Sequence, residues 1–497
     1  MDGLSHLANA LAALAGPWQV AYALGATLVG IMIGLLPGLS ATLGVALFTT
    51  LTVKMAPNDA ILVLICVYVG AIYGGSRTAI LLNIPGTAAN AATCLDGHAL
   101  ARQGQAGRAM GIATTGSVLG SLFGVLCLAI FTPMLAEVAL RFGAFEFFWL
   151  GVAGVMMSGS LTGSSAVKGW LMGLLGIFIA TIGLDPVHAH ERFTFGSNAM
   201  SGGISLIPAL VGAFGFAELL MLMSQPRLPT QKTKLDSVLP RIADVWRYRR
   251  TILRSGVIGV SVGILPGVGE DMGSWTSYAA ARRASKEPQK FGKGSVEGLM
   301  AAETGDNAAI PGALIPALAL GIPGSAPAAV LMSAMIIHGA QPGPMLMINQ
   351  PQYIYDVVGI TLAATLCILI FGLILVRPIL WVLRVPRDVI VPVVFVLCVL
   401  GSYSITQRLF DVWVMLVVGV LCFLLRRRGF PVAPLVLGLV LGEIIDKSLR
   451  RGLVLSDGSL LPFFTRPISA VLALVVVLLL VAQWPGLRRR LMFWSPR

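Results

Sequence analysis

An apolar stretch of the chain, residues 263–278, contains acids in a place where acids are costly. Its sequence is GILPGVGEDMGSWTSY, in which the pair Pro266 and Gly267 and a further Gly269 precede the adjacent acids Glu270 and Asp271. A carboxylate within a membrane-depth segment indicates a function, because its burial is expensive unless something compensates its charge. Either acid could bind a coupling cation or take up a proton. They could also lie at a wet hairpin tip or neutralise a basic side chain.

Further polar residues stand in two other apolar regions. The run ETGDN supplies Glu303, Asp306 and Asn307, whose oxygens could hold a cation together with nearby carbonyls, or could cap a loop. Arg77 lies in the other region, and an Arg within a membrane segment is a functional hypothesis. It could bind a substrate carboxylate, pair with Glu270 or Asp271, or extend to an interface.

Pro-Gly pairs interrupt these apolar regions at four places, beginning at Pro37, Pro85, Pro266 and Pro323. Each pair frees backbone groups from helical bonding, so the break is either a plain kink or part of a central binding site. The repetition of the breaks favours the site. Its predicted substrate-binding residues are those at the breaks together with Arg77, namely Gly38, Ser40, Thr42, Arg77, Asn83, Gly86, Thr87, Gly267, Gly269, Gly324 and Ser325.

Composition indicates the elements that must position these residues. The 497 residues are 56% hydrophobic and only 11% charged, which is too little polar surface for a soluble globule of this size. We expect an all-α polytopic membrane protein without an appended soluble domain. The six cysteines are scattered singly, which favours small core residues, and no metal site is expected.

The breaks recur at nearly constant spacing, which indicates a duplicated chain. Pro37 and Gly38 match Pro266 and Gly267 at an offset of 229, and NIPGT at 83–87 matches GIPGS at 321–325 at 238. We predict two inverted structural repeats with re-entrant hairpins and broken helices. The predicted boundaries are 1–225 for the first repeat, 226–254 for a basic cytoplasmic linker, 255–450 for the second repeat and 451–497 for a C-terminal extra span and basic tail.

The positions of the basic residues predict the orientation. Lys and Arg concentrate in alternate loops, and the linker is the most basic of them, so we expect the N-terminus outside and the C-terminus inside. The segment between Arg254 and Arg282 then begins and ends inside, although two crossings would need roughly 40 residues. It is therefore expected to be a hairpin with its tip at Pro266 and Gly267, and its repeat equivalent would open outward.

Two long blocks carry a family resemblance. The sequences at 73–111 (YGGSRTAILLNIPGT and onward) and 291–344 (through ETGDNAAIPGALIPALALGIPGS) resemble the TctA family, the large membrane subunit of tripartite tricarboxylate transporters. The likeness continues to PVAPLVLGLVLG at 431–442. It implies a permease of the bacterial inner membrane that imports small carboxylates from a periplasmic solute-binding protein, with a small multi-spanning membrane subunit as partner. The driving force it implies is a gradient of Na⁺ or H⁺, with no other cofactor.

This chain departs from the commoner family pattern at Arg77 and at Glu270 and Asp271, where relatives often carry an aliphatic residue and small residues. We expect alternating access and no enzymatic reaction. The alternatives are an intramembrane acid-base enzyme, for which no repeated catalytic constellation is present, and a scaffold or receptor that transports nothing. Uptake by proteoliposomes separates the three.

Overall fold

The structure is a computed structural model that describes residues 2–36, 38–161, 165–185, 189–224, 242–374 and 387–482. Within these ranges the chain is almost entirely helical, and β1 (Gly183–Leu184) and β2 (Glu191–Arg192) form one antiparallel pair. Eight helical stretches there are long and apolar enough to cross a membrane. The prediction of an all-α polytopic membrane protein is confirmed. The eight are α2 (Pro17–Leu35), α4 (Pro57–Leu82), α6 (Ala106–Ala139), α7 (Ala144–Leu161), Leu206–Ser224, α17 (Pro351–Ile374), α19 (Arg387–Thr406) and α20 (Leu409–Arg427).

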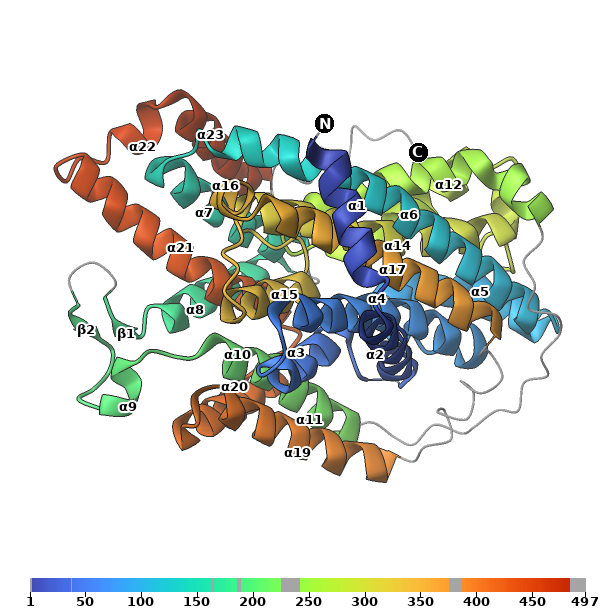
Figure 1. Ribbon diagram of the computed structural model, residues 1–497, viewed down its shortest axis with the longest axis horizontal. Helices are drawn as coiled ribbons and strands as arrows, with labels where there is room; N and C mark the ends of the chain where they lie inside the picture. The colour runs from blue at the N-terminus through green and yellow to red at the C-terminus, as the bar shows by residue number, and fades with distance from the viewer. Residues whose placement is uncertain are drawn as a thin grey trace.

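A central bundle combines helices from both halves of the chain. Its long helices α6 and α14 (Val296–Leu320) run side by side, α2 packs along α4, and α12 (Ile242–Ile264) packs along α14 (Figure 1). Asp96 ties the halves together, because its carboxylate accepts hydrogen bonds from the backbone of Gly292, Gly294 and Ser295 at 2.7–2.9 Å. The bundle also includes α3 (Ala41–Thr52), η1 (Ala88–Asn90), α5 (Ala91–Arg102), α13 (Gly269–Ala284) and α15 (Ala326–Ile337).

Glycines allow the helices of the bundle to touch backbone to backbone. A Cβ on Gly34 would lie 2.0 Å from the Ala71 carbonyl oxygen, and a Cβ on Gly263 would lie 2.5 Å from that of Ala309. These two contacts are equivalent, because the offsets between their members are the 229 and 238 seen in the sequence. The same packing therefore occurs once in each half, α2 on α4 and α12 on α14.

The second break of each half is held by a backbone hydrogen bond, and the two bonds are equivalent. The amide of Gly86 donates to the Gly75 carbonyl at 3.3 Å, and the amide of Gly324 donates to the Ala313 carbonyl at 3.3 Å. All four residues obey the offset of 238. The structure thus repeats the contacts of one half in the other, whereas the inversion of the two halves across the membrane stays a prediction.

Two smaller groups of helices flank the bundle. In the first, α7 and α8 (Ala166–Ala180) pack against α21 (Ala433–Leu455), and in the second, α19 and α20 pack against α10 (Leu206–Leu210), η2 (Val211–Phe216) and α11 (Ala217–Ser224). Figure 1 shows the first group at the left and the second below the bundle. Each group thus joins two helices of one half to the last helix of the other half.

The last helices of the two halves differ in regularity. The last helical stretch of the first half, residues 206–224, contains the π-helical segment η2, whereas α21 of the second half is a continuous α-helix. A π turn accommodates an extra residue without breaking a helix, so η2 keeps residues 206–224 helical.

The predicted linker and C-terminal region are only partly described. Residues 225–241 lie outside the described ranges, whereas residues 242–254 already belong to α12. At the other end, α23 (Pro467–Ala482) has 16 residues, fewer than the roughly 20 that cross a bilayer upright, and it packs against α7. The remaining short helices are α1 (Asp2–Leu14), α9 (Asn198–Ser201), η3 (Pro288–Lys290), α16 (Pro344–Asn349) and α22 (Pro462–Thr465).

Gly34 and Gly25 on the same helix provide a test of the close packing. We expect Gly34→Ala to destabilise the protein by about 1–3 kcal/mol, since its methyl group would displace the backbone of α4. Gly25→Ala is the matched control, because a Cβ there meets nothing within 4 Å. It should leave the melting temperature unchanged or raise it slightly. Equal melting temperatures of the two purified variants would contradict the packing.

Candidate functional site

Backbone turns at the breaks direct the helix ends toward the centre of the bundle. Gly38 and Gly267 have φ of 91° and 73°, and Asn83 and Gly321 end α4 and α14 with φ of 57° and 71°. These left-handed conformations favour Gly or Asn, which are the residues present. The break of the second hairpin falls between α12 and α13, as predicted, and Pro37 of the first lies outside the described residues.

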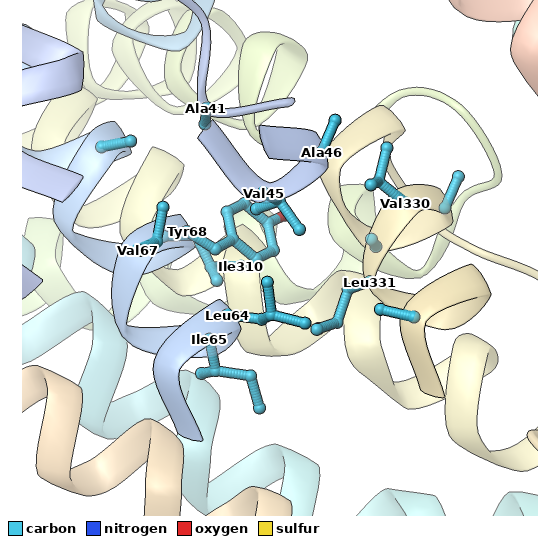
Figure 2. Close-up of a cluster of buried hydrophobic side chains, with 14 of the residues drawn as sticks. Ala41, Val45, Ala46, Leu64, Ile65, Val67, Tyr68, Ile310, Val330 and Leu331 are labelled. Carbon is cyan, nitrogen blue, oxygen red and sulfur yellow. The ribbon is translucent and has the colours of Figure 1, made fainter. Parts of the chain in front are cut away.

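Ser325 lies at the centre of the first of two polar bridges between the halves. Its hydroxyl caps α15 by accepting from the Ala328 amide at 3.3 Å, and it donates to the Glu270 carboxylate at 3.2 Å. From the other half, the Tyr68 hydroxyl lies 2.8 Å from the same oxygen. Figure 2 shows the Tyr68 ring among apolar side chains of α3, α4, α14 and α15. Glu270, Ser325 and Tyr68 are all buried.

Asp306 lies at the centre of the second bridge. Its carboxylate accepts from the Asn90 side-chain amide at 3.2 Å and from that of Asn307 at 2.6 Å. Thr87 donates to the Asn90 carbonyl oxygen at 2.6 Å. Asp306 is the repeat equivalent of Tyr68, and Thr87 is that of Ser325, both at an offset of 238. The two bridges therefore occupy equivalent places, but one contains a phenol where the other contains a carboxylate.

One turn before Asp306, Glu303 lies against the neighbouring half. Its carboxylate accepts from Thr93 at 2.6 Å and from Ser117 at 2.9 Å, and it is not exposed. Its position on α14 faces α6, which also carries the partners of Arg77. Three polar residues, one each from η1, α5 and α6, thus bond the acids of the Glu303, Asp306 and Asn307 group.

Arg77 is buried against α6. Its guanidinium donates to the Met110 carbonyl at 3.0 Å and to the Thr114 hydroxyl at 2.9 Å, and it lies 4.1 Å from the centre of the Tyr73 ring. Thr114 is one helical turn from Ser117, which bonds Glu303, and the charge of Arg77 acts on that acid. Arg77 is 2% exposed, so it does not extend to an interface.

The predicted ion pairs between Arg77 and the hairpin acids are not present. Among the described residues, neither Glu270 nor Asp271 lies within ion-pair distance of Arg77. The two adjacent acids also differ in their surroundings, since the Glu270 side chain is buried and Asp271 is exposed. The structure brings Glu270 to Ser325 and Arg77 toward Glu303.

The remaining predicted residues divide between packing and capping. Gly86 packs against Gly34 and Gly75, and Gly38 faces Leu222 of a flanking group. Gly267 faces Ser158 and Leu437, Gly269 faces Ser325, and Gly324 lies against the Gly263 carbonyl. Ser40 caps α3 by accepting from the Leu43 amide at 3.2 Å, and Thr42 is buried in that helix, whereas Asn83 is exposed.

Sequence reasoning missed four polar residues of the site: Tyr68, Asn90, Thr93 and Ser117. The repeat offset, applied along the whole of α4 and α14, would have paired Tyr68 with Asp306. Asn90 and Thr93 follow the second break of the first half and are three residues apart, about one helical turn, which places them on one face. Ser117 had no such signal, since only packing brings α6 to α14.

The arrangement suits small ions better than covalent chemistry. It combines carboxylates, amide oxygens and hydroxyls, which are the groups that bind hard cations, with helix starts, which favour anions. Among the described residues, no three His, Cys, Asp or Glu side chains group closely enough to hold a metal ion, and the six cysteines are free thiols. Polar groups that come from opposite halves can be separated and rejoined when the halves move.

Comparison with known proteins agrees with this architecture. Over residues 20–437 the chain matches the model of the tripartite tricarboxylate transporter TctA family. It is 35% identical, over 99% of its own length and 98% of the relative's, to a 52.8 kDa protein of the TAR-I ttuC′ 3′ region of Agrobacterium vitis. A second protein, from the TAR-II ttuC′ 3′ region of that organism, is 36% identical over 47% of this chain and 96% of its own length. With a match over most of its length and a relative similar from end to end, the chain belongs to the tripartite tricarboxylate transporter TctA family.

Proposed function

We propose that the chain is the large permease subunit of a binding-protein-dependent secondary transporter that imports small carboxylates by ion-coupled alternating access. The observation that supports this most is the pair of polar bridges at the breaks, each built from both halves. A binding site between two repeats at membrane depth is the usual arrangement in secondary transporters. An intramembrane enzyme would need a reactive pair of groups directed at one bond, and the bridges supply ion-binding groups instead.

The substrate carboxylates would bind where the helices restart after the breaks. The starts of α13 and α15 meet there, since a Cβ on Gly269 would lie 2.4 Å from the Ser325 Cβ. Helix starts carry a partial positive charge, and Ser325 and Thr87 supply hydroxyls at equivalent positions of the two halves. The exposed Asn83 lies beside the second break of the first half, where it is accessible to a ligand. In this proposal Arg77 has an indirect role, because its positive charge acts on the Glu303 carboxylate.

Family membership supports the proposed partners and location. The chain would lie in a bacterial inner membrane with its N-terminus outside and its C-terminus inside. It would receive substrate from a periplasmic solute-binding protein and work with a small multi-spanning membrane subunit. A gradient of Na⁺ or H⁺ would drive the uptake, and no cofactor besides the coupling cation would take part.

Ser325→Ala tests the first bridge. The variant loses the oxygen that joins Tyr68 to Glu270, and the loss of one or two hydrogen bonds should raise the half-saturation concentration for uptake about tenfold. The measurement is uptake of labelled citrate, as a tricarboxylate probe, by cells that contain all three components. Ser333→Ala is the control, because that hydroxyl bonds the Ala329 carbonyl of its own helix. Wild-type uptake by Ser325→Ala would exclude this serine from the site.

The source of energy can be tested on the unaltered protein. Uptake into proteoliposomes should fall at least about tenfold when a Na⁺ ionophore or a proton uncoupler collapses the driving gradient, and it should continue without ATP. Exchange of labelled for unlabelled substrate should persist, since exchange needs no net ion flow. Uptake that requires ATP, or chemical conversion of the substrate, would contradict a secondary transporter.

A further inference from the structure

The buried acids of the central bundle outnumber its buried cations. Glu270, Glu303 and Asp306 are each at most 3% exposed, and the basic side chain whose charge acts on Glu303 is Arg77. A fourth buried acid, Asp96, accepts hydrogen bonds from three backbone amides and from the Tyr278 hydroxyl. A buried carboxylate without a compensating charge costs far more than one with a partner, and the cost is greater at membrane depth. Each of the first three carboxylates is therefore stable in the charged form only where a positive charge compensates it.

Arg77 balances Glu303. The two side chains bond hydroxyls one turn apart on α6, Thr114 for Arg77 and Ser117 for Glu303, and the charge of Arg77 acts on Glu303. Two further hydroxyls, those of Thr93 and Ser76, support the same carboxylate. Arg77 and Glu303 are therefore linked through α6 and by opposite charge, although no direct ion pair within 4 Å joins them.

Asp306 and Glu270 have no such partner. Among the described residues, no Lys, Arg or His lies within 4 Å of either carboxylate. The charged groups that act on them are other acids, since Glu303 and Glu270 act on Asp306, and Asp271 acts on Glu270. Glu270 lies in the first turn of α13, whose helix dipole supplies only about half a unit charge. Asp306 lies in the middle of α14, away from the partial positive charge of the helix start.

An uncommitted oxygen lies beside Asp306. The side chain of Asn307 bonds the Asp306 carboxylate through its amide nitrogen, and its carbonyl oxygen is buried without a hydrogen-bond partner in the described part of the chain. Buried polar atoms are nearly always bonded, so an exception beside a carboxylate indicates a ligand. Carboxylate, amide and hydroxyl oxygens are ligands for a hard cation, and they also accept a proton relayed between them.

We infer that Asp306 and Glu270 each bind one monovalent cation, Na⁺ or H⁺, so that two positive charges enter the bundle with the substrate while Glu303 stays neutralised by Arg77. This inference rests on the proposed transport function and specifies its coupling. An anionic substrate would be repelled by two bare carboxylates, so their neutralisation favours substrate binding. By reciprocity the substrate then favours cation binding, which is the coupling that a gradient-driven importer needs.

Cation counting on the purified full-length chain tests the inference without any transport assay. Equilibrium binding of radioactive sodium, in choline buffer, should saturate at two ions per chain. It should fall to one in Asp306→Asn and to one in Glu270→Gln. Glu218→Gln is the control, because the charge of Glu218 is already paired with Arg426, and the variant should keep both ions.

Removal of Arg77 gives the sharpest result. Arg77→Gln leaves Glu303 without its partner, so this variant should bind a third cation, and Arg77→Gln combined with Glu303→Gln should return to two. A variant that merely misfolds would lose sites and could not gain one. If the cation is H⁺, no sodium binds, and the infrared bands of protonated carboxylic acids should follow the same pattern of gains and losses.

Either readout with this pattern supports the inference. Absence of both sodium binding and protonated acids would overturn it, as would an unchanged count in Asp306→Asn and Glu270→Gln. Citrate uptake measured on the same variants keeps the two proposals apart. A wild-type chain that transports but binds no cation would refute the inference alone, whereas one that binds cations but never transports would refute the proposed function.

Discussion

The close contact between helix backbones at the glycines is the constraint on which the rest of the bundle depends. A broken helix has free amides and carbonyls, and at membrane depth these must be buried in protein or face a polar cavity. Gly86 and Gly324 meet this requirement, since each donates to a carbonyl of the preceding long helix while lying against the end of the hairpin's first helix. A side chain at either position would separate the three segments, and the helix starts could not converge.

Convergence of the helix starts determines where the polar residues can meet. Tyr68 of α4 reaches Ser325 at the start of α15, and Asp306 of α14 reaches Asn90 of η1, because the long helix of each half packs against the break of the other half. The repeat supplies the same geometry twice, and sequence divergence fills it with different chemistry. A duplicated backbone thus places a phenol, Tyr68, in one bridge at the position where the other bridge has a carboxylate, Asp306.

The sequence was sufficient for the class of fold, the breaks and the repeat, since each depends on local composition or on spacing along the chain. It predicted Glu270, Ser325, Glu303 and Asp306 as polar residues of the breaks, but it could not predict their partners. The partner of Arg77 depends on which face of α6 meets α14, and no periodicity in these uniformly apolar helices distinguishes one face from another. The exposure of Asp271 beside a buried Glu270 likewise depends on tertiary packing, although the 100° between successive helical residues allows it.

The two hairpins differ in how their second helices are covered. Thr42, Ala46 and Thr50 of α3 are buried, and Figure 2 shows Ala46 close to α15. Their repeat equivalents on α13, at the offset of 229, are Asp271, Trp275 and Ala279, and all three are exposed.

An exposed carboxylate in this apolar protein requires water or a polar partner at the uncovered face of α13. That face adjoins the buried Glu270, whereas the corresponding face of the first half is closed by α15 and the flanking helices. If the halves exchange their conformations during alternating access, α13 must become covered as α3 is uncovered. The structure, with α13 exposed and α3 covered, then corresponds to one end state of the transport cycle, in which the hairpin that carries Glu270 and Asp271 is the open one.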